Sequence, residues 1–398
     1  MHRKITKNIE HINKNFPQEV LTPVAEDLDQ DVFNPLGNYT SYSAIPSSVE
    51  LQEKEILELR FKSKKKSILL KKAIGKLNKR VGGCGIHRII HTNTSPVLVI
   101  KGEKGGHYYS SMQRCGLIWL CPDCNYKITK ARADELYLQL KADRERGETV
   151  LFITFTLQHK YTDKLDKLLE ILHDAFNYAN THRQWKEIKE GIEFLRTLEV
   201  TRGSNGFHPH YHCLFVGGTD IINKIKILVG LFESRLREIG LETNEHTTTT
   251  RLWNGDIDDM KDYMFKGLLE QELTSGGLKK GKKDSKTFFE LVMDESTPAD
   301  VIREYMTAIK GKRQYHHSKG FFKDTRVKTD IEILHDDKAL EIVCMIPFKT
   351  FKEMRQKGIA REFLPEIAYH GRAGARDLLT LYDIDDSFLD DPPVTIYN

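Results

Sequence analysis

Hydrophobic positions along the chain follow two spacings, one typical of β-strands and the other of α-helices. An unbroken run of β-branched and aromatic residues at 149–157 predicts a strand. Two more strands are predicted at 192–201 and 208–216, and the turn-forming residues 202–206 between them are typical of a hairpin. Leucines at helical spacing predict an amphipathic helix over 165–176.

Helical spacing recurs on both sides of this region. The lysine-rich residues 49–79 predict one or two basic amphipathic helices. Further helices are expected at 131–146, at about 219–239 and 256–272, and from Thr297, which is followed by a proline and an acid in the first turn. We therefore expect an α+β fold, with a central antiparallel β-sheet flanked by helices.

Composition divides the chain into four parts. Residues 1–50 are polar, contain four prolines and show little periodicity, so we expect a partly disordered leader. The other parts are basic helices with a cysteine segment at 51–135, a core at 145–328, and a small appendage with an acidic tail at 329–398.

Charge is sorted into blocks that nearly cancel. Lys and Arg number 61 and Asp and Glu 57, so the formal net charge is only +4. Residues 1–60 hold ten acids and six bases, residues 61–80 hold nine bases and no acid, and residues 377–398 hold six aspartates and no base. Such blocks are either solvated or bind a partner of opposite charge, so the small total does not exclude nucleic acid.

The apolar runs are too short for a membrane protein. The longest, such as Val150–Leu157, cannot cross a bilayer, and the N-terminus lacks the apolar core of a signal peptide. We therefore expect a cytoplasmic protein without membrane association.

Four of the six cysteines fall between residues 84 and 124. In a reducing compartment, Cys84, Cys115, Cys121 and Cys124 are suited to closing a tetrahedral, structural Zn²⁺ site, because a Cys-x-x-Cys pair places two sulfurs on one tight turn. His87 or His107 could replace Cys84 in that site. The alternative is a set of buried or redox-active cysteines.

Two histidines share one face of the strand at 208–216. His210 and His212 are two residues apart, so their imidazoles point the same way, whereas Cys213 and Phe215 face the opposite side. The preceding strand supplies Glu199, which a hairpin closed at 202–206 brings opposite the histidines. Two imidazoles and a carboxylate with open positions form a catalytic metal environment. His208 is an alternative ligand.

A helix predicted at 256–272 places three chemical groups on one face. Asp259, Tyr263 and Lys266 follow at spacings of four and three residues. A nucleophilic phenolate needs a nearby cation, because a free tyrosine titrates near pH 10, and Lys266 is suited to provide it. The alternative is ordinary surface charge around an exposed tyrosine.

Basic residues near these motifs are candidate contacts to DNA phosphates. They lie within the basic segments 62–80, 127–132, 279–286 and 310–327. The residues singled out are Lys127, Lys130, Arg132, Lys279, Lys280, Lys282, Lys283, Lys312 and Arg313.

The order and spacing of the motifs resemble a known family. The strand FITFTLQH, the strand with Glu199, the run HPHYHCLFV and the helix motif YMFK are similar to those of the HUH-superfamily initiators of rolling-circle plasmid replication. The upstream segment RCGLIWLCPDCNYKITKAR and the downstream elements GKRQ and SKG resemble a subgroup with a cysteine segment before the first strand. The resemblance covers about residues 84–325.

This resemblance implies an HUH-endonuclease core and a role for each motif. His210 and His212 would be the metal-binding pair and Glu199 a third ligand for Mg²⁺ or Mn²⁺, with Tyr263 as the nucleophile and Lys266 as the lysine of its motif. Family members often have Glu four residues before the tyrosine, proposed to activate water at termination. Here that position is Asp259, which is one methylene shorter, and Asp262, on a different helical face, is the alternative.

The function implied is nicking of one strand at a plasmid double-strand origin through a covalent 5′-phosphotyrosine, followed by rejoining at termination. Single-stranded and origin DNA would be the partners, and a host helicase and the replication machinery are candidate further ones. One alternative is a transposase or mobilisation relaxase of the same superfamily. Another, of a different class, is a zinc-containing DNA-binding regulator without nuclease activity.

Overall fold

The structure is a computed structural model that describes residues 50–89, 95–102, 106–252, 285–335 and 338–396, with side chains from residue 61 onwards. The predicted leader lies outside the described residues, except for its last residue. In chain order, the helices and strands are α2 (Glu50–Leu77), α3 (Lys79–Gly83), β1 (Val97–Gly102), β2 (His107–Tyr109), α4 (Pro122–Glu145), β3 (Thr149–Phe155), α5 (Leu165–Thr181), α6 (Arg183–Ile188), β4 (Glu193–Gly203), β5 (Gly206–Gly217), α7 (Ile221–Glu238), β6 (Thr248–Leu252), α10 (Phe288–Met293), α11 (Ala299–Ala308), β7 (Tyr315–His317), α12 (Asp330–His335), β8 (Ala339–Ile346), α13 (Phe348–Gln356), α14 (Ala360–Tyr369), α15 (Gly371–Leu381), the 3₁₀ helix η2 (Ser387–Leu389) and β9 (Val394–Thr395).

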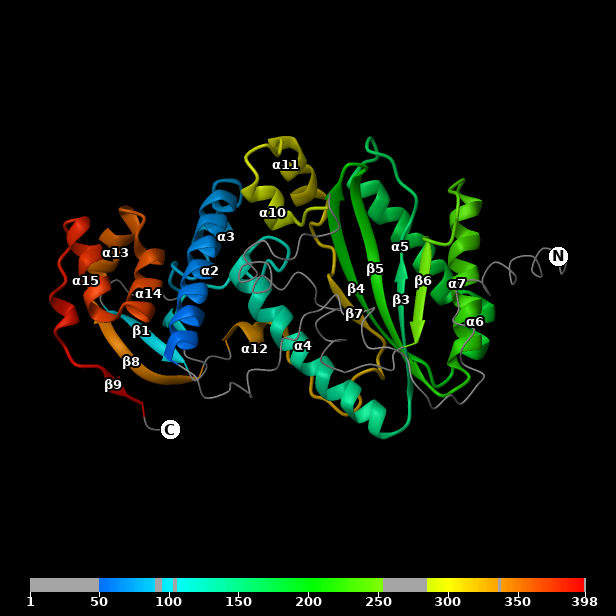
Figure 1. Cartoon of the computed structure of the whole chain (residues 1–398), viewed down its shortest axis with the longest axis horizontal. Helices are drawn as coiled ribbons and strands as arrows, with labels where there is room; N and C mark the ends of the chain where they lie inside the picture. Colours follow the sequence, from blue (N-terminus) through cyan, green and yellow to red (C-terminus); the bar gives the residue numbers. More distant parts are fainter. Residues whose placement is uncertain (1–49, 90–94, 103–105, 253–284, 336–337, 397–398) are drawn as a thin grey trace.

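Five antiparallel strands form the central sheet, in the order β6-β3-β5-β4-β7 (Figure 1). Strands β4 and β5 are a long hairpin that closes at the pair Gly203 and Gly206. Gly206 has φ +89°, a conformation that favours glycine. The predicted α+β class and the three predicted strands are confirmed. Strands β6 and β7 were not predicted. Strand β7 has only three residues, and β6 consists largely of threonine, so neither shows a run of apolar residues.

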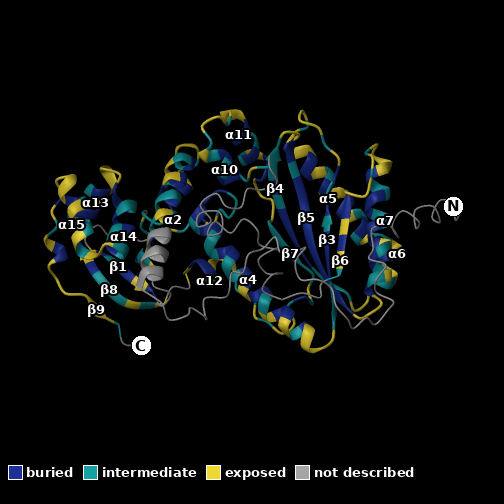
Figure 2. Cartoon of the chain, viewed as in Figure 1, coloured by how far each residue is buried: buried dark blue, intermediate teal, exposed yellow. Residues whose placement is uncertain are grey.

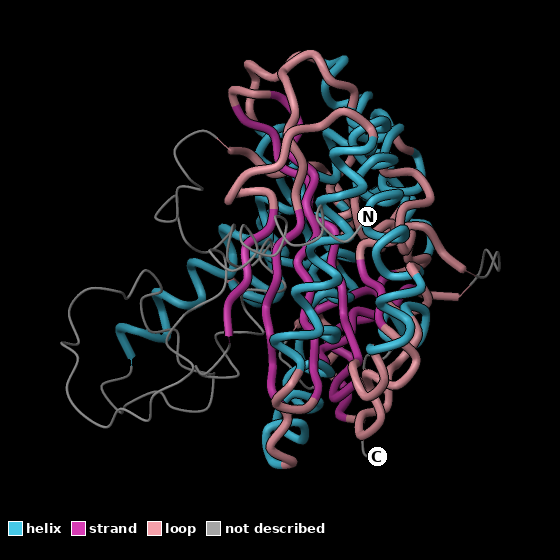
Figure 3. The backbone as a smooth tube through the Cα atoms, turned by 90° about the vertical axis from the view of Figure 1, so that its right-hand side faces the viewer, coloured by secondary structure: helices cyan, strands magenta, loops and turns pink. Residues whose placement is uncertain are grey.

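Helices cover both faces of this sheet (Figure 1). On one face, Phe155, Cys213 and Phe215 belong to the core shared with α5, α6 and α7. On the other face, Phe152 and Leu214 pack with α4. Strand β5 is therefore buried along nearly its whole length (Figure 2), and the turned view in Figure 3 shows the strands running side by side among the helices.

Helix α4 begins at Pro122, nine residues before the predicted start at residue 131. Pro122 occupies the start of the first turn, where a backbone N–H has no intrahelical partner to lose, and Cys121 precedes it as N-cap. The Cys121-x-x-Cys124 pair therefore lies at the start of a 24-residue helix and not on an isolated turn, which corrects the sequence interpretation.

The lysine-rich segment at 61–80 forms α2 and the start of α3, as predicted. Several of its lysines pair with carboxylates from distant parts of the chain. The pairs are Lys64 and Lys71 with Asp123, Lys65 with Glu366, and Lys72 with Glu362. Part of this basic block is therefore neutralised within the fold.

A second antiparallel sheet has the order β2-β1-β8-β9. Its core includes Val97 and Val99 of β1, Ile346 of β8, and apolar residues of α13 to α15. The Tyr109 hydroxyl of β2 donates a hydrogen bond of 2.5 Å to the Ala360 carbonyl of α14. The sheet thus joins the segments 51–135 and 329–398, which the sequence analysis separates.

Residues 377–396 of the predicted acidic tail are folded against the second sheet. Arg376 pairs with Asp386 at 3.0 Å and with Asp390 at 2.7 Å. Four apolar residues anchor the segment in the core of the second sheet: Leu379, Ile384, Phe388 and Leu389.

No helix within the described part of the chain is both long enough and apolar enough to cross a membrane.

Candidate metal and DNA site

Glu199, His210 and His212 converge on one face of the β4–β5 hairpin. Glu199 is paired with His210 across the two strands, as the sequence predicts. The Glu199 Oε2 atom lies 2.8 Å from His210 Nε2 and 2.9 Å from His212 Nε2, and the two Nε2 atoms are 3.0 Å apart. Three potential ligand atoms therefore surround one point.

The remaining ring nitrogens of both histidines are held by neighbouring groups. His212 Nδ1 is hydrogen-bonded to the Thr154 hydroxyl of β3 at 3.1 Å, and His210 Nδ1 donates to the His208 carbonyl at 3.4 Å. On binding a metal ion, each imidazole would keep its proton on Nδ1 and direct the lone pair of Nε2 toward the ion. Both rings are thereby oriented as ligands.

The spacing of the three atoms fits a divalent cation. Ligands about 2.1 Å from an ion at adjacent octahedral positions lie about 3.0 Å from one another, close to the observed separations. Burial opposes ionisation of Glu199, but hydrogen bonds from His210 and His212 outweigh it and hold the pKa of the carboxyl below its usual value. The ionised carboxylate is the form that binds a metal ion.

His208 lies outside this triad. Its Nδ1 is 2.8 Å from His159 Nε2, and its Nε2 is 3.4 Å from the Thr156 hydroxyl. Burial, together with the neighbouring His210 and His159, lowers the pKa of His208 to about 4. The geometry favours His210 and His212 over His208 as the histidine ligands.

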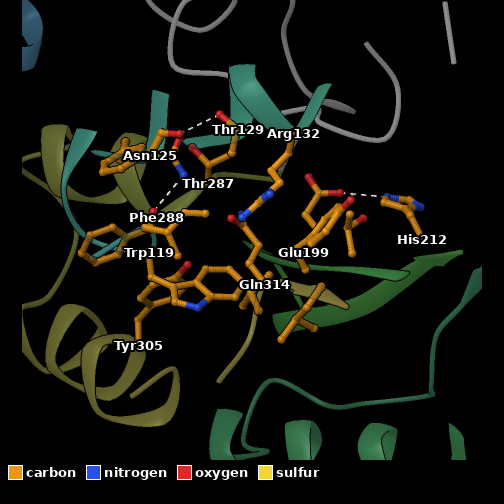
Figure 4. A pocket seen from close by; sticks show the side chains of 16 residues that line it. Trp119, Asn125, Thr129, Arg132, Glu199, His212, Thr287, Phe288, Tyr305 and Gln314 are labelled. Atoms are coloured by element: carbon orange, nitrogen blue, oxygen red, sulfur yellow. Dashed lines mark hydrogen bonds and ion pairs between the residues drawn. The ribbon is translucent and has the colours of Figure 1, made fainter. Parts of the chain in front are cut away.

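A pocket opens beside the triad (Figure 4). Glu199 and His212 lie at one side of it, and the aromatic side chains of Trp119, Phe288 and Tyr305 lie at the other. The Phe288 and Tyr305 rings stack with centroids 4.4 Å apart. Phe288 and Tyr305 are buried, whereas Trp119 is partly exposed and is therefore suited to stack on an unstacked base of a single nucleic-acid strand.

The four predicted cysteines form a second cluster. The Sγ atoms of Cys84 and Cys124 are 3.6 Å apart, those of Cys115 and Cys124 3.7 Å, and those of Cys121 and Cys84 3.7 Å. Sulfurs about 2.3 Å from a tetrahedral Zn²⁺ lie about 3.8 Å apart, so this donor set fits such an ion. His87 is not a member of the cluster, and neither is His107.

Two cations accompany the cysteine cluster, the buried Lys71 and the half-buried Arg361. Lys71 is buried and pairs with Asp123 at 2.6 Å. Hydrogen bonds from the other cysteines, led by Cys115, lower the pKa of the Cys84 thiol, and the positive charge of Lys71 lowers it further. Arg361 of α14 donates to the carbonyls of Gly82 and Cys84. A divalent ion on four thiolates leaves a net negative charge, which these two cations oppose.

The candidate nucleophile helix and the basic loop after it lie outside the described residues. This applies to Asp259, Tyr263, Lys266, Lys279, Lys280, Lys282 and Lys283. The described residues on either side are Leu252, paired with Leu151 of β3, and Lys286, bridged to Arg202 of β4.

The basic residues predicted at 127–132 make contacts within the protein. Arg132 is buried, and its guanidinium donates to Glu135, to Asp330 and to the Lys328 carbonyl, each at 2.7 Å. This differs from the DNA-facing surface charge that the sequence predicts, although Arg132 lines the pocket. The two lysines of this segment also form hydrogen bonds within the protein. Lys127 donates to the Leu334 carbonyl, and Lys130 donates to the Tyr126 hydroxyl.

Lys312 and Arg313 are exposed beside the pocket. The Trp119 indole N–H donates to the Lys312 carbonyl at 2.9 Å, which ties this basic pair to the pocket wall. Both residues therefore stay candidate contacts to DNA phosphates.

The sequence analysis did not identify several residues that surround the two clusters. Thr154 follows from the strand alternation at 149–157, because it shares the histidine face once the register with β5 is known. Trp119 lies next to the cysteine motif, which is its only sequence signal. Lys71 and Arg361 have no sequence signal, because the fold brings them to the cysteines from distant segments.

Part of the chain matches a family of known proteins. Residues 111–225 match the model of a family described as replication protein. This stretch contains three of the four clustered cysteines and all of Glu199, His210 and His212. No solved structure matches the chain.

Curated relatives include two that are named as replication proteins. A "Protein rep" of Streptomyces lividans is 31% identical over 171 residues, 35% of this chain and 38% of the relative. A "Protein rep" of Lentilactobacillus hilgardii is 21% identical over 217 residues, 54% of this chain and 66% of the relative. A "Neomycin resistance protein" of Streptomyces cyanogenus is 26% identical over 151 residues, 31% of this chain and 35% of the relative.

The chain thus spans about one third to two thirds of the length of these relatives. The matched residues include the strand and histidine motifs that suggest the resemblance. The predicted similarity to plasmid replication (Rep) proteins is thereby confirmed, and it rests on residues 111–225 of this chain.

Proposed function

We propose that this protein initiates rolling-circle replication of a plasmid by nicking one DNA strand and later rejoining it. The observation that carries the proposal is the convergence of Glu199, His210 and His212 within 3.0 Å beside an aromatic pocket. These atoms sit in the part of the chain that matches replication proteins. Single-stranded and origin DNA are its proposed substrates.

Glu199, His210 and His212 would hold Mg²⁺ or Mn²⁺, and such an ion supplies polarisation of a non-bridging oxygen of the scissile phosphate. The Tyr263 phenolate oxygen attacks phosphorus, and the bond from phosphorus to the 3′ oxygen breaks. The products are a 5′-phosphotyrosine and a 3′-hydroxyl, which takes up a proton. Lys266 stabilises the phenolate. At termination, a new 3′-hydroxyl or a water activated by Asp259 attacks the phosphotyrosine and releases Tyr263.

The described ends of the nucleophile segment support this assignment. Thr287 and Phe288, the first residues of the α10 region, line the same pocket as Glu199 and His212. Lys286 pairs with Arg202, three residues beyond Glu199 on β4. After the residues that include Tyr263, the described part of the chain therefore resumes beside the candidate metal ligands.

The cysteine cluster has a separate proposed role, as a structural Zn²⁺ site. All four sulfurs are buried, so no position is left for a substrate. Its ligands come from the end of α3, from the segment after β2 and from the start of α4. The ion would therefore tie these three segments together.

A covalent-adduct assay tests the nicking proposal. Full-length protein, Mn²⁺ and single-stranded oligonucleotides from the double-strand origin of its own replicon are expected to give a protein–DNA adduct that survives denaturation. Tyr263→Phe abolishes the adduct, whereas the control Tyr382→Phe, at an exposed position of the second sheet's helices, retains it. An adduct with Tyr263→Phe contradicts the assigned nucleophile.

Two other results would redirect the proposal. Cleavage of transposon ends or of a transfer origin, with none at the replicon's own origin, supports a transposase or a mobilisation relaxase. Sequence-specific binding with no adduct in Mn²⁺ supports the zinc-containing regulator.

A further inference from the structure

One edge of the central sheet has a gap beside the Glu199 pocket. Strand β4 is covered along this edge at two places. At one of them, β7 pairs with residues 195–197, and the Leu198 N–H donates to the Gln314 carbonyl at 2.7 Å. At the other, Arg202 and Lys286 exchange two backbone hydrogen bonds of 2.9 and 2.8 Å. Between these two places, no described segment pairs with the edge.

The backbone of Val200 points into this gap. In an antiparallel ladder, the N–H and C=O groups of alternate residues point to the same edge. Leu198 and Arg202 donate away from β5, so Val200 between them also points away, and it lies opposite Pro209, which has no N–H. The Leu198 carbonyl and both backbone groups of Val200 have no hydrogen-bond partner among the described residues. The edge therefore presents an acceptor, a donor and an acceptor in a row.

These backbone groups belong to the wall of the pocket beside the candidate metal ligands. Leu198, Glu199 and Val200 all line that pocket. The Glu199 side chain points to the face of the sheet, toward His210 and His212, whereas the backbone groups on either side of it point to the edge. A molecule held at the edge would therefore lie next to the Glu199 triad.

The short gap and its surroundings favour a flat aromatic group over a peptide strand. Only Val200 points outward between the two covered places, and an added strand would need several paired residues. The partly exposed Trp119 lies in the same pocket, on the side away from Glu199 and His212 (Figure 4). Its indole N–H is held by the Lys312 carbonyl at 2.9 Å. An aromatic face and a row of backbone groups are together suited to an unstacked base.

The order of the backbone groups discriminates among the bases. The Watson–Crick edge of adenine carries the N6 amino donor, the N1 acceptor and then a C–H group, which complement the Leu198 carbonyl, the Val200 N–H and the Val200 carbonyl in that order. Adenine is the only DNA base without a carbonyl oxygen, so no base oxygen would face these two backbone carbonyls. We propose that the gap in the β4 edge binds one unstacked adenine of the single strand at the nick site, an inference that rests on the proposed function for its substrate.

Val200→Pro tests the backbone donor. Proline removes the N–H, and an edge strand accepts proline where that group points away from the ladder. Binding of a single-stranded oligonucleotide of the nick site to the full chain is measured by fluorescence anisotropy without added Mg²⁺ or Mn²⁺, so that no cleavage occurs. We expect affinity to fall about tenfold. The control Val200→Ala keeps the N–H and should leave the affinity unchanged.

Base analogues test the same contact from the side of the DNA and need no variant protein. Each adenine of the oligonucleotide is replaced in turn by purine, which lacks the amino group, by 1-deazaadenine, which lacks the N1 acceptor, or by 7-deazaadenine, which keeps both. At one position, the first two analogues should each weaken wild-type binding about tenfold, and the third should not. With Val200→Pro, 1-deazaadenine at that position should cause no further loss, because the N–H that it would have contacted is already absent.

A proline on the opposite edge of the sheet controls for the change in the backbone. Thr156 donates to the Thr247 carbonyl, so the hydrogen-bonded pairs between β3 and β6 fall at odd-numbered residues of β6, and the Thr250 N–H points away from the ladder. Thr250→Pro should leave the affinity for the oligonucleotide unchanged. Melting temperature and zinc content are recorded for each variant, and if Val200→Pro does not fold, the analogues with wild-type protein decide the result.

Three results overturn the adenine site: unchanged binding by a folded Val200→Pro protein, the absence of any adenine that responds to the analogues, or an equal loss of binding with Thr250→Pro. The outcome is separable from the nicking proposal, because binding is measured without cleavage. A protein that forms no adduct in Mn²⁺ but loses its adenine-dependent binding with Val200→Pro would reject the nicking function and retain the base site.

Discussion

The two candidate metal clusters differ in how the chain builds them and in what they leave accessible. Glu199, His210 and His212 come from one hairpin, and the Glu199 side chain keeps 26% of its surface exposed at the pocket. The cysteine cluster draws on three separate segments, and all four of its residues are buried. An open, local site is suited to a substrate, whereas a closed, non-local site is suited to holding the fold together.

This contrast predicts opposite consequences of losing each cluster. The β4–β5 hairpin is held by eleven residue pairs and by apolar contacts on both faces, so its register does not depend on a bound ion. The segments that contain Cys84 and Cys115 are short and lie between α3, β2 and α4, so they depend more on the contacts among the cysteines. Stability and activity are therefore expected to separate.

Cys124→Ser is expected to have the largest effect on stability. A structural Zn²⁺ contributes about 10 kcal/mol or more of folding free energy in small zinc peptides, and we expect Tm to fall by more than about 10 °C here. Purified protein should also lose its zinc, measured by elemental analysis. The control Cys213→Ala removes a buried sulfur outside the cluster and should lower Tm by only a few degrees. Equal losses of Tm in the two variants would contradict a structural metal.

Glu199→Gln is expected to have the largest effect on activity at little cost in stability. The amide keeps the size of the side chain but removes the charge that the two histidines stabilise, so adduct formation should fall by at least about 100-fold. Thermal unfolding should stay within a few degrees of wild type. Glu190→Gln, at an exposed position before β4, is the control and should retain full activity. Activity of Glu199→Gln close to that of wild type would exclude Glu199 as a ligand.

The open site could be predicted from the sequence because its geometry is local. The alternation of His210 and His212 places both on one face, and the turn at 202–206 determines that Glu199 lies opposite them. The surroundings of the closed site could not be predicted in this way. Lys71 and Arg361 meet the cysteines only after α2 and α14 have packed together, and β1 pairs with β8 across more than 230 residues of sequence. Long-range pairing of this kind leaves no pattern in a single sequence.

Thr154→Val tests the support of the open site with a smaller expected effect. The change keeps the shape of the side chain and removes the hydroxyl that bonds His212 Nδ1. Loss of such a supporting hydrogen bond typically costs 10- to 100-fold in metal affinity or activity, so adduct formation should fall by about 10-fold and the Mn²⁺ requirement should rise. Thr250→Val is the matched control, because Thr250 is a buried threonine on the adjacent strand β6 whose hydroxyl has no hydrogen-bond partner among the described residues. The same loss in both variants would assign the effect to packing.

Arg361→Met tests the support of the closed site and should give the smallest change. Its guanidinium approaches the backbone of Gly82 and Cys84 from α14, and the net negative charge of a metal-loaded cysteine cluster favours that cation. Zinc affinity, measured by competition with a chromophoric chelator, should fall by a few-fold to about 10-fold while adduct formation persists. Arg372→Met removes a guanidinium that bonds backbone carbonyls elsewhere in the same helical region, and it should leave zinc affinity unchanged. If both variants retain zinc equally well, Arg361 serves only to dock α14 and does not offset the charge of the cluster.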